Sequence, residues 1–157
     1  MKFKKLFACC LAFAFVGMAC GCNGVGGAEN SSDTQSNAEQ DENLNYELVK
    51  ADGKVIITIT KNNHTKNVKL IEIMERLQLE GKFSYQISDG MITQIDDVAN
   101  TSSSYWMLYT DHETFSNTEW GTLEYNGKTY ASAMFGADTM PATNGVTYVW
   151  SYETPSW

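Results

Sequence analysis

Two short segments in the first half of the chain alternate between apolar and polar residues. Residues 55–60 carry Val or Ile at every odd position, which is the period of a β-strand with one face in a core. Residues 46–50 precede them, and the Asp52-Gly53 pair between the two segments favours a tight turn. The pattern therefore predicts a β-hairpin.

The next apolar positions recur with a helical period. After a polar stretch they fall at i, i+3, i+4 and i+7, so they form one stripe along a predicted helix. Asn67 is the expected N-cap of this helix, and Gly81 is the expected residue just beyond its C-terminal end. The stripe consists of Leu70, Ile73, Met74 and Leu77.

The rest of the chain has the short apolar runs, bounded by turn residues, that are typical of β-strands. One helix can cover only one face of a sheet. The prediction is therefore a single α+β domain over residues 46–157, with one helix packed on a mixed β-sheet, for which a β-grasp arrangement is the simplest solution. The expected strands are residues 83–88, 91–95, 105–110 and 146–152, with an inserted hairpin, 122–125 and 129–134, on the Asn126-Gly127 turn.

Residues 1–22 have the pattern of an export signal. Three lysines precede an apolar run at residues 6–18, which is shorter than the roughly 20 residues that span a bilayer. Small residues and two cysteines follow, and a cysteine at the cleavage point resembles a bacterial lipoprotein signal, in which that thiol receives the lipid. Cys20 is the expected acceptor and Cys22 the alternative. The other interpretation is an ordinary secreted protein cut after Ala19 or Gly21.

Composition separates a tether from the folded part. Residues 23–45 are rich in Gly, Ser, Asn, Gln and acids, so they are expected to form a flexible acidic tether, or else an uncleaved propeptide. All four cysteines lie in the leader, which leaves the rest of the chain without a disulfide framework or a thiolate metal site.

The charge of the chain excludes two classes of partner. The whole chain has a net charge of −8, and without the leader 8 basic and 19 acidic residues remain, a net charge of −11. Such a charge argues against nucleic acid, whose phosphates dominate binding, and against electrostatic docking on anionic lipid. The membrane is instead expected to be reached through the N-terminal lipid.

The C-terminal half contains four distinctive strings, residues 90–100, 104–109, 136–141 and 144–152. In this order and spacing they resemble the C-terminal domain of transcobalamin and intrinsic factor. They resemble even more closely a related bacterial domain of unknown function that occurs in Gram-positive lipoproteins and cell-wall proteins. The resemblance covers about residues 55–153, and no string within it is catalytic.

This resemblance implies a β-grasp fold and binding of cobalamin or a related corrinoid without catalysis. In the animal carriers the domain is one of two halves that close around the corrin, and this chain is expected to act without the helical half. It also departs from the family at residues 110–135, where it carries the inserted hairpin and a loop. Binding by one desolvated face is expected to be weak.

Aromatic residues crowd the last third of the chain, and a small β domain needs about half of them for its core. Tyr148 and Trp150 share one face of the last predicted strand. Because Val146 and Val149 are better candidates for the core, this row of aromatic residues is expected to be only partly covered. Trp120 and Phe115 lie in the insertion. The expected ligand-binding residues are Tyr105, Trp106, Trp120, Tyr148 and Trp150.

No catalytic constellation is evident, so the chain is not expected to be an enzyme. His64 and His112 sit in separate polar loops, and Asp96-Asp97 are interpreted as turn residues rather than as paired carboxylates. Asp111, Glu113 and Asp138 lack the spacing of a Ca²⁺ loop. No metal or resident cofactor is expected.

The sequence thus predicts a lipid-anchored module on the outer side of the cell membrane of a Gram-positive bacterium. Its expected function is to capture a ligand, with cobalamin as the specific proposal and a transporter or cell-surface protein as the partner. The alternative is an adhesion or assembly module that contacts a protein or a glycan.

Overall fold

The computed structural model describes residues 42–154. The predicted leader, with Cys20 and Cys22, and residues 23–41 of the predicted tether lie outside the described residues. In chain order the elements are β1 (Leu44–Ala51), β2 (Lys54–Asn62), α1 (Leu70–Leu79), β3 (Tyr85–Ser88), β4 (Met91–Ile95), β5 (Val98–Ala99), β6 (Tyr105–Thr110), β7 (Ser116–Tyr125), β8 (Lys128–Ala133) and β9 (Thr147–Glu153).

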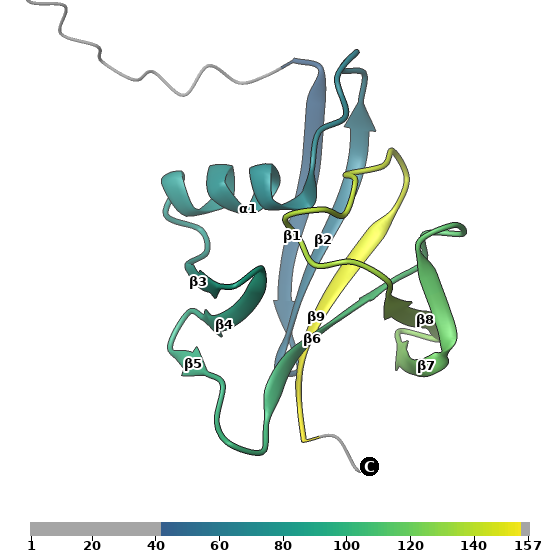
Figure 1. Ribbon diagram of the computed structural model, residues 1–157. Coiled ribbons are helices and arrows are strands. Elements are labelled where there is room, and N and C mark those ends of the chain that lie inside the picture. Colours follow the sequence, from purple (N-terminus) through teal and green to yellow (C-terminus); the bar gives the residue numbers. More distant parts are fainter. Residues whose placement is uncertain (1–41, 155–157) are drawn as a thin grey trace, which may run out of the picture. The chain divides into compact units, whose positions relative to one another are not determined.

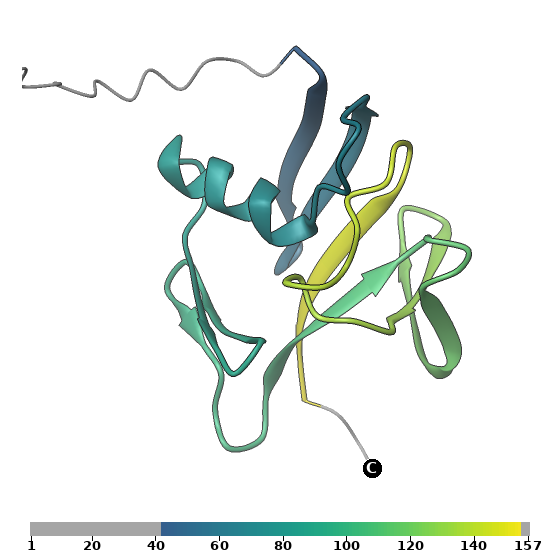
Figure 2. The ribbon, with the colours of Figure 1, turned by 45° about the horizontal axis from the view of Figure 1, so that its top comes forward.

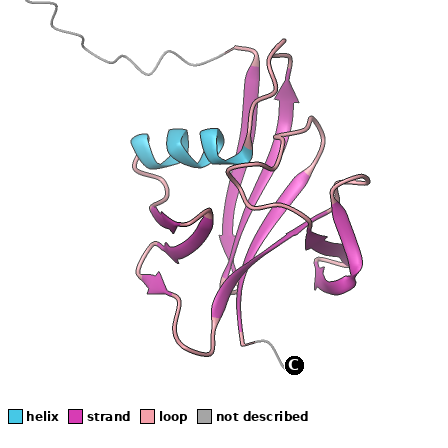
Figure 3. Cartoon of the chain, viewed as in Figure 1, coloured by secondary structure: helices cyan, strands magenta, loops and turns pink. Residues whose placement is uncertain are grey.

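The strands form two sheets, and every pairing between described strands is antiparallel. The large sheet has the order β1-β2-β9-β6-β8-β7, and β3, β4 and β5 form a small sheet. Helix α1 runs across the strands of the large sheet, with the small sheet beside it (Figures 1 and 2). The fold is therefore mostly antiparallel β-sheet with one short helix (Figure 3), and the expected mixed sheet is wrong. After α1 the chain enters the small sheet at β3, and it does not form a strand that pairs in parallel with β2 in the large sheet.

The hairpin turns follow from residues that tolerate positive φ. Asp52 and Gly53 have φ of 53° and 69°, and Asn126 and Gly127 have φ of 50° and 72°. Two successive positive φ angles are those of a type I′ turn, whose twist matches that of the flanking strands. Both predicted turns are confirmed.

Helix α1 begins at Leu70, with Lys69 rather than Asn67 as its N-cap. The N–H groups of Leu70 and Ile71 donate to backbone carbonyls of Met140 and Ala137, both at 2.9 Å. The loop after β8 therefore satisfies donors that a capping side chain would otherwise have to satisfy. At the other end the prediction is confirmed, because Gly81 follows the C-cap with φ 69°.

Apolar residues are buried on both faces of the large sheet. The main core lies between the sheet, α1 and the small sheet, and it contains the whole predicted helical stripe. A second cluster lies on the opposite face, where the half-buried Met107, Leu123 and Tyr125 pack against it. Its buried members are Ile56, Tyr109, Tyr130 and Val149.

Three predicted boundaries need correction. Strand β1 starts at Leu44, which is only 4% exposed, so the folded part takes in the last residues of the predicted tether. Strand β3 starts at Tyr85 rather than at residue 83. Strand β7 starts at Ser116 rather than at residue 122, because an irregularity between Asn117 and Thr122 breaks its alternation.

We expect Gly136→Ala to destabilise the fold by about 1–3 kcal/mol, as overpacking does. A Cβ at Gly136 would lie 2.9 Å from the carbonyl oxygen of Gly90, so the β3–β4 turn and the loop that caps α1 would have to separate. Urea unfolding measures the loss, and hydrogen exchange locates it. The Leu70 and Ile71 amides should exchange faster in the variant; unchanged exchange would contradict this account.

Candidate functional site

The structure divides the five predicted ligand-binding residues into two groups. Tyr148 is fully buried, Trp150 is 3% exposed and Trp106 is 9% exposed. Tyr105 and Trp120 are 38% and 61% exposed. The expected aromatic row on the last strand does not face solvent, and the five residues do not form one site.

Of the three buried rings, Tyr148 and Trp106 have hydrogen-bond partners for their polar atoms inside the domain, whereas the indole nitrogen of Trp150 is buried without one among the described residues. The Tyr148 hydroxyl donates to the carbonyl of Pro141 and accepts the N–H of Thr143. The Trp106 indole N–H donates to the carbonyl of Val98 at 2.8 Å. Amphipathic rings are readily buried when such partners exist.

Val149 and Val146 explain why the expectation failed. Val149 is fully buried, as predicted, and it lies on the face of β9 opposite to the aromatic row, in the second cluster. Val146 precedes the strand and is half-buried. The prediction assumed that one face of this strand is exposed to solvent, whereas β9 lies in the middle of the sheet and is covered on both faces.

An open groove of about 520 Å³ lies between the β1–β2 turn and the small sheet. Val55, Ile95 and Trp106, all buried, supply an apolar floor, and the half-exposed Val98 borders it. Its full lining is Lys50, Ala51, Asp52, Gly53, Lys54, Val55, Ile95, Asp96, Val98, Trp106, Ser151 and Tyr152. We call this the β1–β5 groove.

Hydrogen bonds hold the wall of the β1–β5 groove in place. The Tyr152 hydroxyl donates to the carbonyl of Ala99 at 3.0 Å, next to the bond from Trp106 to Val98. The Trp106 and Tyr152 rings are 5.4 Å apart between centroids. The short strand β5 is thus tied by two aromatic side chains to β6 and β9, and the groove is pre-formed.

A second cleft of about 430 Å³ lies on the other side of Lys50. Two lysines, Lys50 and Lys82, and the phenol of Tyr46 line it together with Leu48 and Leu77. Burial raises the pKa of Tyr46 to about 12, helped by its hydrogen bond to the Glu80 carboxylate at 3.1 Å. The phenol is therefore uncharged at neutral pH.

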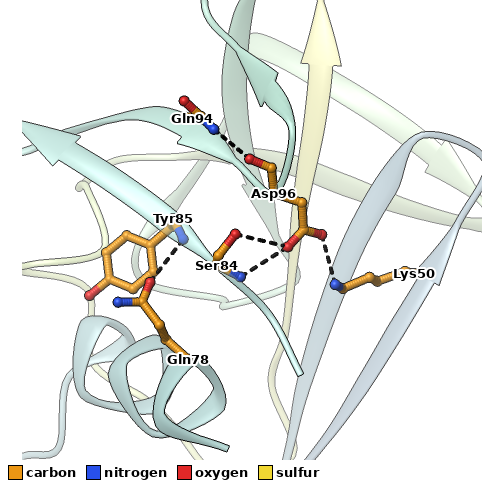
Figure 4. Close-up of polar contacts among 6 residues, drawn as sticks. All are labelled: Lys50, Gln78, Ser84, Tyr85, Gln94 and Asp96. Carbon is orange, nitrogen blue, oxygen red and sulfur yellow. Dashed lines mark hydrogen bonds and ion pairs between the residues drawn. The ribbon is translucent and has the colours of Figure 1, made fainter. Parts of the chain in front are cut away.

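The two clefts meet at an ion pair between Lys50 and Asp96, whose charged atoms are 2.7 Å apart (Figure 4). The other carboxylate oxygen of Asp96 accepts the backbone N–H and the hydroxyl of Ser84, at 2.9 and 3.3 Å. The Gln94 amide donates to the Asp96 carbonyl at 2.6 Å. Asp96 thus joins the small sheet to β1.

These bonds set the charge state of Asp96. Its burial alone would raise the pKa of the carboxyl, but the hydrogen bonds from Lys50 and Ser84 and the charge of Lys50 outweigh burial. The pKa of Asp96 is therefore lowered, and the carboxylate is ionised at neutral pH.

Sequence reasoning treated Asp96 only as a turn residue and did not single out Lys50 or Val98. The turn is confirmed, since Asp96 has a φ of 47° between β4 and β5. The one sequence signal for Lys50 is its place beside the predicted Asp52-Gly53 turn. The pairing of Lys50 with Asp96 depends on tertiary structure and has no counterpart in the local pattern.

Two of the histidine and acidic candidates, His112 and Asp111, have structural partners. The Nδ1 of His112 accepts the N–H groups of Thr114 and Phe115, at 3.2 and 3.3 Å, so the ring orders its own loop. Asp111 accepts the N–H of Thr147 at 2.8 Å and pairs with Lys128. No group of three or more His, Cys, Asp or Glu in residues 42–154 could hold a metal ion.

Trp120 lies far from the groove in the sheet order, on the edge strand β7. While β8 advances from Ser132 to Ala131, β7 advances from Asn117 to Thr122, so residues 118–121 form a bulge. We call this segment the β7 bulge. It carries Trp120 outwards, with 61% of the side chain exposed.

Comparison with known proteins adds no relative: no protein-family model, curated protein or solved structure matches the chain. The resemblance to the transcobalamin C-terminal domain therefore stays a prediction. No helix in residues 42–154 has both the length and the apolar character needed to cross a membrane.

We expect Asp96→Asn to lower the free energy of unfolding by about 0.5–1 kcal/mol, the contribution of a half-exposed ion pair. Asn tolerates the φ of 47° as Asp does and keeps an acceptor for Ser84, so only the charge is lost. Asp96→Ala should cost about 2–3 kcal/mol, because it also loses that acceptor and strains the turn. Urea unfolding of Asp96→Asn, Lys50→Met and the double variant tests the pair. If the changes in the free energy of unfolding of the two single variants simply add in the double variant, the ion pair contributes nothing and the prediction is contradicted.

The ion pair should also contribute a pH dependence. The folded-state pKa of Asp96 lies below its unfolded value, so its stabilisation is present above the unfolded pKa. It is lost as the pH falls below about 4 and passes through the folded pKa. The stability difference between the native chain and Asp96→Asn should therefore shrink on acidification. A constant difference from neutral to acid pH would contradict the assignment.

Proposed function

We propose that the chain is a lipid-anchored, extracytoplasmic ligand-binding module without catalytic activity, and that its ligand occupies the β1–β5 groove. The observation that carries the proposal is the groove itself. It combines a buried apolar floor at Val55, Ile95 and Trp106 with a hydrogen-bonded wall and charged groups at the rim. Its volume is in the usual range for small-molecule sites. The proposed anchor is Cys20, with Cys22 as the alternative.

The ligand that we propose is cobalamin or a related corrinoid. The support is the resemblance of residues 90–100 and 104–109 to the transcobalamin C-terminal domain, since these strings contribute β4, β5 and Trp106 to the groove. We further propose a β-grasp-like relationship, supported by the order of hairpin, crossing helix and later strands. A corrinoid is larger than the groove, so one side of the ligand would stay open and binding would be weak.

We expect cobalamin to quench tryptophan fluorescence saturably at micromolar concentrations, because Trp106 lines the groove. Val98→Glu should weaken binding about tenfold, since it places a charge at the edge of the apolar floor. Val98 is 42% exposed, so the substitution should leave the fold intact.

Val49→Glu is the matched control. Val49 is 47% exposed on β1 and does not line the groove. The Val49→Glu variant should therefore bind cobalamin as tightly as the unmodified chain does. Absence of saturable quenching would end the corrinoid proposal. Equal weakening by both variants would show that the ligand does not occupy the groove.

A second candidate function is contact with a protein or a glycan at the cell surface, which the exposure of Trp120 on the β7 bulge favours. Phe115, predicted beside it, is half-buried against the main core and packs edge-on against Phe135 at 5.5 Å. Trp120 is therefore the better residue for testing this candidate.

A further inference from the structure

We propose that the β7–β8 hairpin and the loop before it form a docking surface for a positively charged protein segment. The inference rests on the second candidate function and names the chemistry of its partner. It is independent of the β1–β5 groove, because β7 and β8 lie at the opposite edge of the sheet from β1.

The first observation is the segregation of charge. Residues 42–82 carry seven basic and six acidic residues, whereas residues 83–154 carry nine acidic residues and one lysine. That lysine, Lys128, pairs with Asp111 and is not available to neutralise the other acids of the hairpin. Glu113, Glu119 and Glu124 are exposed there.

The second observation is an anchor among these acids. Trp120 is the most exposed tryptophan of the described chain, at 61%, and it directly follows Glu119. The N–H of Glu119 donates to the Asn117 side chain at 2.8 Å, which orders the start of the β7 bulge. Tryptophan is enriched among residues that dominate binding energy at interfaces, and its ring face attracts ammonium and guanidinium groups.

The third observation is that the β7 bulge covers a feature that destabilises the fold. Beneath it, the hydroxyl of Ser132 is buried without a hydrogen-bond partner among the described residues, and a Cβ on Gly121 would approach that oxygen to 3.3 Å. A buried hydroxyl without a hydrogen-bond partner destabilises a fold. Local features that destabilise a fold are concentrated at functional sites.

Charge selects the partner. A second copy of this chain would bring the same exposed acids face to face, and like charges across an interface are unfavourable. A neutral glycan can stack on the Trp120 ring and donate hydroxyl hydrogen bonds to Glu119 and Glu124, but it gains no charge–charge attraction from their carboxylates. A basic segment uses both the ring and the carboxylates, and it is the occupant that the surface fits best.

The test uses a fluorescent peptide in which lysine alternates with leucine, and its glutamate–leucine counterpart as the probe of opposite charge. The full chain should bind the lysine peptide alone, and binding should weaken as salt is raised. Trp120→Ala should lower the affinity about tenfold, and Trp120→Phe should retain most of it. Glu119→Lys should also lower the affinity and reduce the dependence on salt.

Two control variants separate a specific surface from net charge. Glu47→Lys changes an exposed acid on β1, and Leu79→Ala removes a side chain that is 85% exposed on α1. Both should bind the lysine peptide like the unmodified chain. If Glu47→Lys weakens binding as much as Glu119→Lys does, the attraction is general and the proposal is overturned.

A glycan probe gives the competing outcome. If an N-acetylglucosamine oligosaccharide binds in a Trp120-dependent manner while the lysine peptide does not, the surface recognises glycans and the proposal is overturned. Cobalamin quenching is measured separately on Val98→Glu. Failure of groove binding and failure of peptide binding are therefore distinguishable.

Discussion

The arrangement of the domain depends on backbone hydrogen bonds between α1 and a loop that is distant in sequence. Carbonyls of Ala137 and Met140 accept the first N–H groups of the helix, and the N–H of Ala142 donates to Val68 just before it. The same loop approaches the β3–β4 turn so closely at Gly136 that no Cβ fits. The helix, the small sheet and the entry to β9 are therefore positioned together, and the main core closes between them.

Much of the secondary structure could be predicted because it depends on local patterns. The apolar period located α1, β4 and β6 well, and the Asp-Gly and Asn-Gly pairs marked two hairpin turns. The N-cap was wrong because its acceptors lie in a remote loop. The antiparallel sheet was missed because strand order depends on which strands pair after the helix, and the alternation within β9 carries no information about β2 or β6.

The candidate site could be predicted only in part. Trp106, one of the five predicted binding residues, lines the groove, whereas Tyr148 and Trp150 belong to the core. The sequence pattern around a tyrosine in a strand is the same whether its hydroxyl faces water or donates to a carbonyl in a distant loop, as Tyr148 does. The Lys50–Asp96 pair joins residues from two sheets, so no single segment of sequence signals it.

The β7 bulge also affects whether copies of the molecule can assemble through the edge of the large sheet. The outer strand of a sheet presents unpaired backbone groups that can template the addition of a strand from another chain. Four bulged residues interrupt that row between Asn117 and Thr122, and they twist the backbone out of register. This end of the sheet is thereby protected from the edge-to-edge strand addition that produces fibres.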